Sequence, residues 1–168
     1  MKSVALIVLC SGMALSTAAF AQEAETQPGY LTVNIERGNP VARVTDPVSN
    51  NTLVASCTDG VIGFNIRYGA LTMQQAPDQV VTVSFETHKG KVEVPATSTP
   101  SEGMAITSAD ATIQGKIREA FRSFIGMTSD EIGTVTISDE QAGSIGTLAV
   151  SGKGSTAALG RVMKGCEG

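Results

Sequence analysis

The sequence predicts an α+β fold: an antiparallel sheet of short strands with one long amphipathic helix and a C-terminal helix, stapled by a disulfide. Apolar and polar residues alternate in several segments between residues 30 and 94, which is the pattern of half-buried strands. From about Ser108 the apolar spacing becomes helical. Strands followed by a helix, two strands and a last helix indicate two packed layers.

The first 21 residues have the pattern of a bacterial signal peptide. Lys2 supplies the positive charge, residues 4–15 form the apolar stretch, and residues 19–21 are a small-residue cleavage site. The apolar stretch is shorter than the roughly 20 residues that a membrane-spanning helix needs. We therefore expect a signal peptide at 1–21, a flexible leader at 22–29 and a single α+β domain at 30–168.

Six segments of the first half alternate or are apolar enough to be strands. They are residues 30–36, 41–44, 52–57, 62–68, 79–86 and 92–94. In the first of them, Leu31, Val33 and Ile35 are expected to share one buried face. The last is expected to end at Pro95.

The pair Asp59-Gly60 is the strongest hairpin signal in the chain. Both residues of a tight primed turn need positive φ, and Asp-Gly accepts that conformation readily. We therefore expect a hairpin whose first strand carries Cys57.

The long helix is predicted after about Ser108. Its apolar face is formed by Ile113, Ile117, Ala120, Phe121, Phe124 and Ile125. Ser108 or Asp110 is expected to cap the start, and Gly126 is expected to end the helix in a left-handed conformation. Gly115 weakens the helix by up to about 1 kcal/mol relative to Ala.

The end of the chain predicts two more strands and the C-terminal helix. The strands are residues 132–138 and 147–151, separated by a loop around residues 139–143. A turn at residues 152–154 leads into a helix at 155–166, with Ser155 as its N-cap.

Cys57 and Cys166 are the two cysteines that remain when Cys10 leaves with the signal peptide. Two cysteines in an oxidising compartment usually pair, and the alternative is two free thiols. A bridge closing a loop of about 100 residues contributes about 4.7 kcal/mol in the chain-entropy treatment.

The charge balance argues against some classes of partner. The chain has 12 Lys+Arg and 16 Asp+Glu, a formal net charge of −4, and losing Lys2 makes it more negative. Nucleic acids and anionic membrane surfaces favour basic proteins. We expect neither as a partner, and after signal cleavage we expect no integral membrane segment.

Few residues have the pattern of a catalytic site. His88 is the one histidine, so a nucleophile–histidine system would have to use it, but it lies in a turn and is more simply solvent-exposed. The pairs Asp130-Glu131 and Asp139-Glu140 flank a strand and could approach one another for acid–base chemistry. Solvated loop carboxylates are the simpler interpretation, so we expect no catalytic residues and no enzyme activity.

No metal site or cofactor is expected. One histidine and two cysteines that are expected to pair do not make a zinc set, and no calcium-loop spacing occurs. Residues 152–156 read Gly-Lys-Gly-Ser-Thr, but a phosphate loop needs Ser or Thr directly after the lysine. A strand-to-helix turn explains the glycines better.

The candidate binding residues are Lys116, Arg118 and Arg122 on the long helix. They could receive an acidic partner or a polyanion. The alternative is a solvated helix face, balanced by Glu119.

Residues 52–166 resemble the VasI/TagO-like periplasmic proteins associated with type VI secretion. The likeness lies in a strand ending in Ser56-Cys57, the turn at residues 58–60, the alternating strand after it, and a closing helix that ends in Cys166. The group often has a tryptophan after the Val-rich strand, and this chain has none. The resemblance implies a non-catalytic envelope protein with a Cys57–Cys166 bridge and supplies no catalytic residues.

The sequence therefore predicts a non-catalytic periplasmic or secreted module that binds proteins or serves the envelope or a secretion system. Its expected partner is an envelope protein or a cell-wall component, and its oligomeric state is not predicted. The alternative is an inhibitor of a secreted hydrolase, a protease or a lysozyme. In that case the Ser/Thr/Pro-rich segment Thr97–Gly103, expected to be an exposed loop, would enter the active site.

Overall fold

The computed structural model describes residues 28–36, 38–67, 79–99, 103–106, 108–140 and 143–167. The predicted signal peptide and residues 22–27 of the predicted leader lie outside this part of the chain. Within it, ten strands form one sheet and two helices pack on that sheet, so the α+β class is confirmed. The elements are β1 (Gly29–Tyr30), β2 (Thr32–Glu36), β3 (Asn39–Thr45), β4 (Thr52–Thr58), β5 (Val61–Arg67), β6 (Val80–Thr87), β7 (Gly90–Thr99), β8 (Gly103–Ile106), α1 (Ala111–Ile125), β9 (Ile132–Asp139), β10 (Gly143–Ser151) and α2 (Ser155–Gly165).

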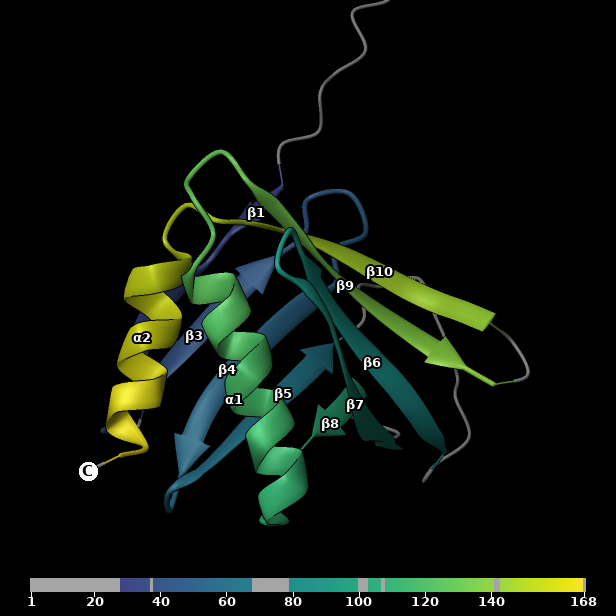
Figure 1. Ribbon diagram of the computed structural model, residues 1–168, viewed down its shortest axis with the longest axis horizontal. Coiled ribbons are helices and arrows are strands. Elements are labelled where there is room, and N and C mark those ends of the chain that lie inside the picture. Colours follow the sequence, from purple (N-terminus) through teal and green to yellow (C-terminus); the bar gives the residue numbers. More distant parts are fainter. Residues whose placement is uncertain are drawn as a thin grey trace, which may run out of the picture.

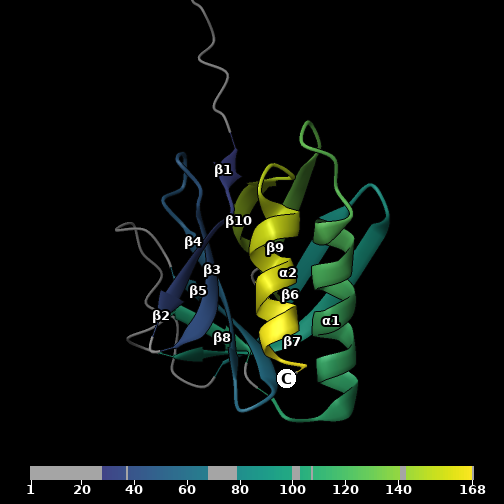
Figure 2. The same cartoon turned by 90° about the vertical axis from the view of Figure 1, so that its left-hand side faces the viewer.

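The sheet curls because one short segment of chain belongs to both of its ends. The strand order is β1-β10-β9-β6-β7-β8-β5-β4-β3-β2, and every neighbouring pair except β1 and β10 is antiparallel. β1 and β2 are separated in the chain only by Leu31, yet they are the two outermost strands. Figures 1 and 2 show α1 and α2 side by side on one side of this curled sheet.

The core lies between the helices and the sheet face that points toward them. Alternate side chains of the strands are buried on this face, which is why period-two alternation predicts the strands well. Three aromatic contacts join strands to helix: Phe64 with Phe85 at 4.6 Å between ring centroids, Phe64 with Phe121 at 4.5 Å, and Phe85 with Phe124 at 6.2 Å. These contacts bring β5, β6 and α1 together.

The predicted Asp59-Gly60 hairpin is confirmed. Asp59 has φ 51° and Gly60 has φ 78°, so both residues of the turn between β4 and β5 have positive φ. The register follows, with Thr58 opposite Val61 and Cys57 opposite Ile62.

Helix α1 begins after Asp110, which is its N-cap. The Asp110 carboxylate accepts hydrogen bonds from the N–H groups of Thr112 at 2.8 Å and Ile113 at 3.2 Å. The prediction of a left-handed Gly126 is wrong, because its φ is −84°. A Cβ there would lie 1.8 Å from the Lys89 ammonium nitrogen, which is the end of an exposed, flexible side chain and can move aside.

The predicted N-cap of helix α2 is wrong by one residue. Its N-cap is Gly154, with φ 83°, and Ser155 is the first helical residue. The buried Ser155 hydroxyl instead donates to the carbonyl of Phe124 at 2.9 Å, and the Thr156 hydroxyl donates to that of Ile125 at 2.8 Å. The first turn of α2 thus satisfies carbonyls that the last turn of α1 leaves without helical partners.

Strand β7 continues through Pro95, so the prediction that it ends there is wrong. A proline is tolerated because β8 pairs with β7 only at Thr97–Thr99, and Pro95 directs its missing N–H to the unpaired part of that side. The predicted exposed loop at Thr97–Gly103 is wrong at both ends, which are strands. Residues 100–102 lie outside the described part of the chain.

Three other expectations need correction. The strands vary from 2 to 10 residues and the helices have 15 and 11, so short strands with one long helix describe only part of the fold. β10 begins at Gly143, earlier than predicted. Ile35 is 65% exposed instead of buried, because β2 is the outermost strand of the sheet that the described residues form.

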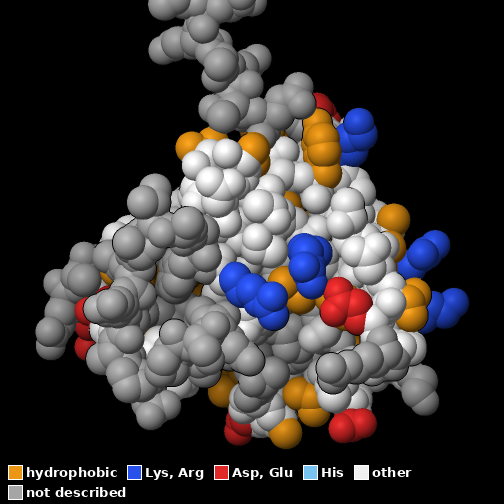
Figure 3. Space-filling model, turned by 180° about the vertical axis from the view of Figure 1, so that it is seen from behind, with side chains coloured by type: hydrophobic (Ala, Val, Ile, Leu, Met, Phe, Trp, Pro, Cys, Tyr) orange, Lys and Arg blue, Asp and Glu red, His pale blue; other side chains and the backbone are white. Residues whose placement is uncertain are grey.

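The sheet face that points away from the helices is mainly polar. Figure 3 shows this side, where the described surface is mostly backbone and uncharged polar side chains, with a few Lys or Arg and Asp or Glu side chains near its centre. An ion pair between Arg43 and Glu36, 3.1 Å apart, belongs to this face by strand alternation.

Candidate functional site

Cys57 and Cys166 form the predicted disulfide. Their Cα atoms are 5.5 Å apart, although 109 residues separate them in the chain. Cys57 is buried near the end of β4, and Cys166 is the C-cap of α2. The bridge therefore ties the end of α2 to β4, the third strand from the β2 end of the sheet.

The three candidate binding residues of α1 do not form one stripe. At about 100° per residue, Arg118 and Arg122 lie about 40° apart around the helix, whereas Lys116 lies roughly 160° from Arg118. Arg118 is half-buried, and its guanidinium lies 4.0 Å from the Glu167 carboxylate. Arg122 is exposed in the last turn of α1. Lys116 points to β7 instead.

A groove with a volume of about 430 Å³ lies between α1 and β7. It is lined by Lys91, Val92 and Glu93 from β7 and by Lys116 and Glu119 from α1. The charged wall from α1 and the charged wall from β7 face each other. They can do so because, within the described structure, no strand pairs with residues 91–95 of β7 on the side where β8 pairs further along. Each wall carries one lysine and one glutamate.

The charges of the groove are coupled. The Lys91 ammonium lies 2.5 Å from the Glu93 carboxylate. This hydrogen bond, helped by the charge of Lys91, a hydrogen bond from Ser84 and the charge of Lys116, lowers the pKa of Glu93. The Glu93 carboxylate in turn raises the pKa of Lys91. At neutral pH Lys91 and Glu93 are therefore both ionised.

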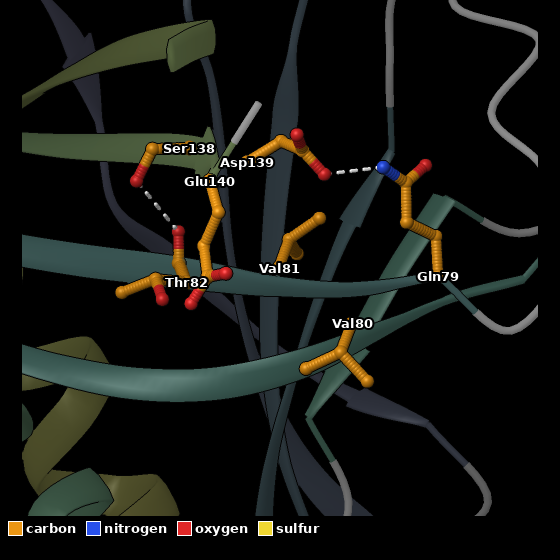
Figure 4. Close-up of a pocket in the computed structure, with 7 residues that line it drawn as sticks. All are labelled: Gln79, Val80, Val81, Thr82, Ser138, Asp139 and Glu140. Carbon is orange, nitrogen blue, oxygen red and sulfur yellow. Dashed lines mark hydrogen bonds between the residues drawn. The ribbon is translucent and has the colours of Figure 1, made fainter. Parts of the chain in front are cut away.

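A second pocket, of about 400 Å³, lies where β6 begins and β9 ends. Figure 4 shows Asp139 directed toward Gln79, whose amide donates a hydrogen bond to the carboxylate. Ser138 donates to the carbonyl of Thr82 at 3.4 Å. Val80, Val81 and Glu140 complete the lining. The pocket has acidic and hydrogen-bonding groups, and two hydrogen bonds join groups of its own lining.

His88 is half-exposed in the turn between β6 and β7. Its Nδ1 lies 3.0 Å from the Glu131 carboxylate, and the other oxygen of that carboxylate accepts a hydrogen bond from the Thr128 N–H at 2.6 Å. The pair joins the β6–β7 turn to the segment between α1 and β9. Asp130 accepts a hydrogen bond from the Thr128 hydroxyl at 2.6 Å, which lowers the pKa of Asp130.

The two acidic pairs do not come together. Asp130 and Glu131 precede β9, Asp139 is its last residue and Glu140 follows it. The 8-residue strand therefore holds the two pairs about 25 Å apart. The suggestion that they approach one another is therefore wrong, because a strand is an extended spacer.

The glycine-rich segment at residues 152–154 is a turn between β10 and α2, as predicted. Its Lys153 ammonium lies over the Tyr30 ring, 5.1 Å from the centroid. The hydroxyl of Ser155 is engaged with two carbonyls, those of Phe124 and Gly152. The segment is thus occupied by contacts within the domain.

The described residues contain neither a metal-binding cluster nor a membrane-spanning helix. No group of three or more His, Cys, Asp or Glu side chains in the described ranges is placed to hold a metal ion. No helix in that part of the chain is long and apolar enough to cross a membrane.

Sequence analysis points to the α1 wall of the groove, through Lys116 and Glu119, and not to the β7 wall. Lys116 was singled out, but Lys91 and Glu93 were not. Their signal was available as charges at alternate positions after the His88 turn. Which helix they face depends on the strand order, which local patterns do not report. Comparison of the chain with known protein families, with curated proteins and with solved structures finds no match.

Proposed function

We propose that this protein is a non-catalytic binding module that works in the periplasm or after secretion, on an envelope protein or a cell-wall component. The disulfide supports a place outside the cytoplasm, because such bridges persist mainly in oxidising compartments. The VasI/TagO-like resemblance of residues 52–166 makes a component of a secretion system the first partner to test.

The groove between α1 and β7 is the proposed binding surface. The observation that carries this proposal is the position of Lys116 and Glu119, which line the groove and make no salt bridge within the described part of the chain. Across from them, Lys91 and Glu93 already neutralise each other. A partner segment with an acidic and a basic group would complement Lys116 and Glu119.

Such a site selects a partner more than it binds tightly. Complementary charges at the rim of an interface steer association and reject like-charged partners, and they weaken with salt. The half-buried Val92 offers the groove a small apolar floor. We therefore expect recognition of one segment of a larger partner.

A periplasmic pull-down with light cross-linking and mass spectrometry tests the proposal when it is run with matched variants. Lys116→Glu reverses one charge in the groove, and Lys164→Glu reverses one exposed lysine on α2, away from it. We expect one envelope protein to be retained by the wild type and by Lys164→Glu and to be lost with Lys116→Glu.

The other outcomes decide between the alternatives. Equal retention by both variants would place the binding surface elsewhere. Retention of a secreted protease or lysozyme, with loss of its activity, would favour the inhibitor function. Retention of a secretion-system component would support the role that the resemblance implies.

A further inference from the structure

Strand β2 presents an unpaired edge. It is the last strand of the sheet and pairs with β3 in the register Thr32 opposite Arg43 to Glu36 opposite Asn39. The closing pair of a two-residue hairpin exchanges hydrogen bonds, and such pairs recur at every second residue. The N–H and C=O groups of Val33 and Ile35 therefore point away from β3, to a side where no strand in the described part of the chain pairs with them.

The same strand carries the exposed Ile35. Its side chain is 65% exposed and shares a face with Val33, which packs against the core. It lies beside Pro40, which touches the end of α2 at Gly165. Open main-chain groups beside an exposed aliphatic side chain form a ready template for another strand.

We propose that β2 pairs with β2 of a second copy of this chain, antiparallel and about a two-fold axis through Asn34. In this register Val33 lies opposite Ile35 of the partner subunit, and Thr32 lies opposite Glu36 of the partner subunit. Asn34 lies opposite its own copy. Each pair thus joins residues of like character, apolar on the inner face and polar on the outer face.

This match favours a second copy over an unrelated peptide. Within β2 only Val33 and Ile35 direct main-chain groups outward, and an axis through Asn34 is the one that lets both residues exchange hydrogen bonds inside the strand. Four main-chain hydrogen bonds form, and Ile35 is covered.

The helices leave room for this pairing. Helix α2 lies against β2, β3 and β4, centred on β3, one strand in from the edge. In the paired sheet the two β3 strands are three strand spacings apart, roughly 14 Å. Two helices pack at 8–10 Å between axes, so the two copies of α2 fit side by side.

Sedimentation equilibrium of the purified protein tests the pairing. We expect the wild type to dimerise and Ile35→Lys to raise the dissociation constant at least tenfold. Ile132→Lys is the matched control, because Ile132 is 57% exposed but lies on β9, which has strands on both sides. The control should dimerise like the wild type. A monomeric wild type, or a dimer that Ile35→Lys leaves unchanged, would overturn the proposal.

A cysteine placed at the axis tests the register. Asn34 would form a non-hydrogen-bonded pair with its copy, with Cα atoms about 4.5 Å apart, inside the range of roughly 4.4–6.8 Å that disulfides span. Asn34→Cys should therefore give a reducible covalent dimer under mild oxidation, and adding Ile35→Lys should abolish it. Thr32→Cys would face Glu36 of the partner subunit and should stay monomeric on non-reducing gels. Equal cross-linking at both positions would refute this register.

Discussion

The buried Asp46 carboxylate accepts a hydrogen bond from the Ala149 N–H, with 3.1 Å between Oδ2 and the nitrogen. Asp46 follows β3, whereas Ala149 lies on β10, 103 residues further along the chain. Oδ1 of the same carboxylate accepts from the Val48 N–H at 2.8 Å. Nearby, the Asn51 amide donates to the Thr147 carbonyl at 3.3 Å. The β3–β4 turn thus supplies hydrogen bonds to β10 where its short pairing with β1 ends.

Asp46→Ala should lower the free energy of unfolding by about 1–3 kcal/mol, because the N–H groups of Ala149 and Val48 would lose their charged acceptor. Urea unfolding followed by circular dichroism measures this loss. Asp130→Ala is the control, since Asp130 is exposed and accepts from a hydroxyl in a surface turn. Equal losses of unfolding free energy in the two variants would show that the Asp46 hydrogen bonds stabilise the fold no more than the surface bond of Asp130 does.

Cys166→Ala should lower the free energy of unfolding by about 2–5 kcal/mol, because a loop of 109 residues is no longer closed in the unfolded chain. The melting temperature should fall by several degrees, and limited proteolysis should cleave α2 earlier. The wild type measured with a thiol reductant should behave like the variant. A melting temperature that neither change alters would contradict a stabilising bridge.

Gly115→Ala should raise the free energy of unfolding by up to about 1 kcal/mol, because Gly115 lies in α1 with no atom within 4 Å of the added Cβ. Gly152→Ala should have the opposite effect, since its Cβ would lie 1.9 Å from the carbonyl oxygen of Thr128. Thermal melts of the two variants measure both signs. Stabilisation by both substitutions would mean that the turn before α2 can shift to accommodate the added methyl group at little cost.

Lys91→Ala should raise the pKa of Glu93 toward its ordinary value near 4.5, since the hydrogen bond from Lys91 is the main cause of its lowering. A lowered carboxyl pKa contributes stability that is present above the unfolded-state pKa and is lost as the pH falls through the folded-state value. The side-chain carbon shift of Glu93, followed by NMR from pH 7 to about pH 2, measures the change. Lys164→Ala should leave the titration unmoved, and 1 M salt should weaken the effect of Lys91.

Local patterns predicted much of the fold. Alternation placed β4, β5 and β6, helical spacing placed α1, and Asp59-Gly60 placed a turn, because each of these depends on neighbours in the chain. Cysteine counting predicted the bridge, since it requires only two thiols and an oxidising compartment. The same reasoning failed at Ile35 and Pro95, where burial and pairing depend on which strands lie alongside.

The candidate site was predicted only in part for the same reason. The sequence singled out Lys116, but its groove is completed by Lys91 and Glu93, and only the packing of α1 beside the unpaired part of β7 brings the two walls together. Arg118 and Arg122 were grouped with Lys116 by proximity in sequence, whereas the helical turn of about 100° per residue separates them.

The sequence by itself determined the α+β class, the main strands, the position of α1 and the Cys57–Cys166 pair, because periodicity, turn chemistry and cysteine number are properties of short segments or of composition. Only the tertiary structure decided the strand order and contacts such as Asp46 with Ala149. It also decided that β1 and β2, which are neighbours in the chain, lie at opposite ends of the sheet. Those contacts join residues far apart in the chain, and packing the whole sheet around two helices selects them.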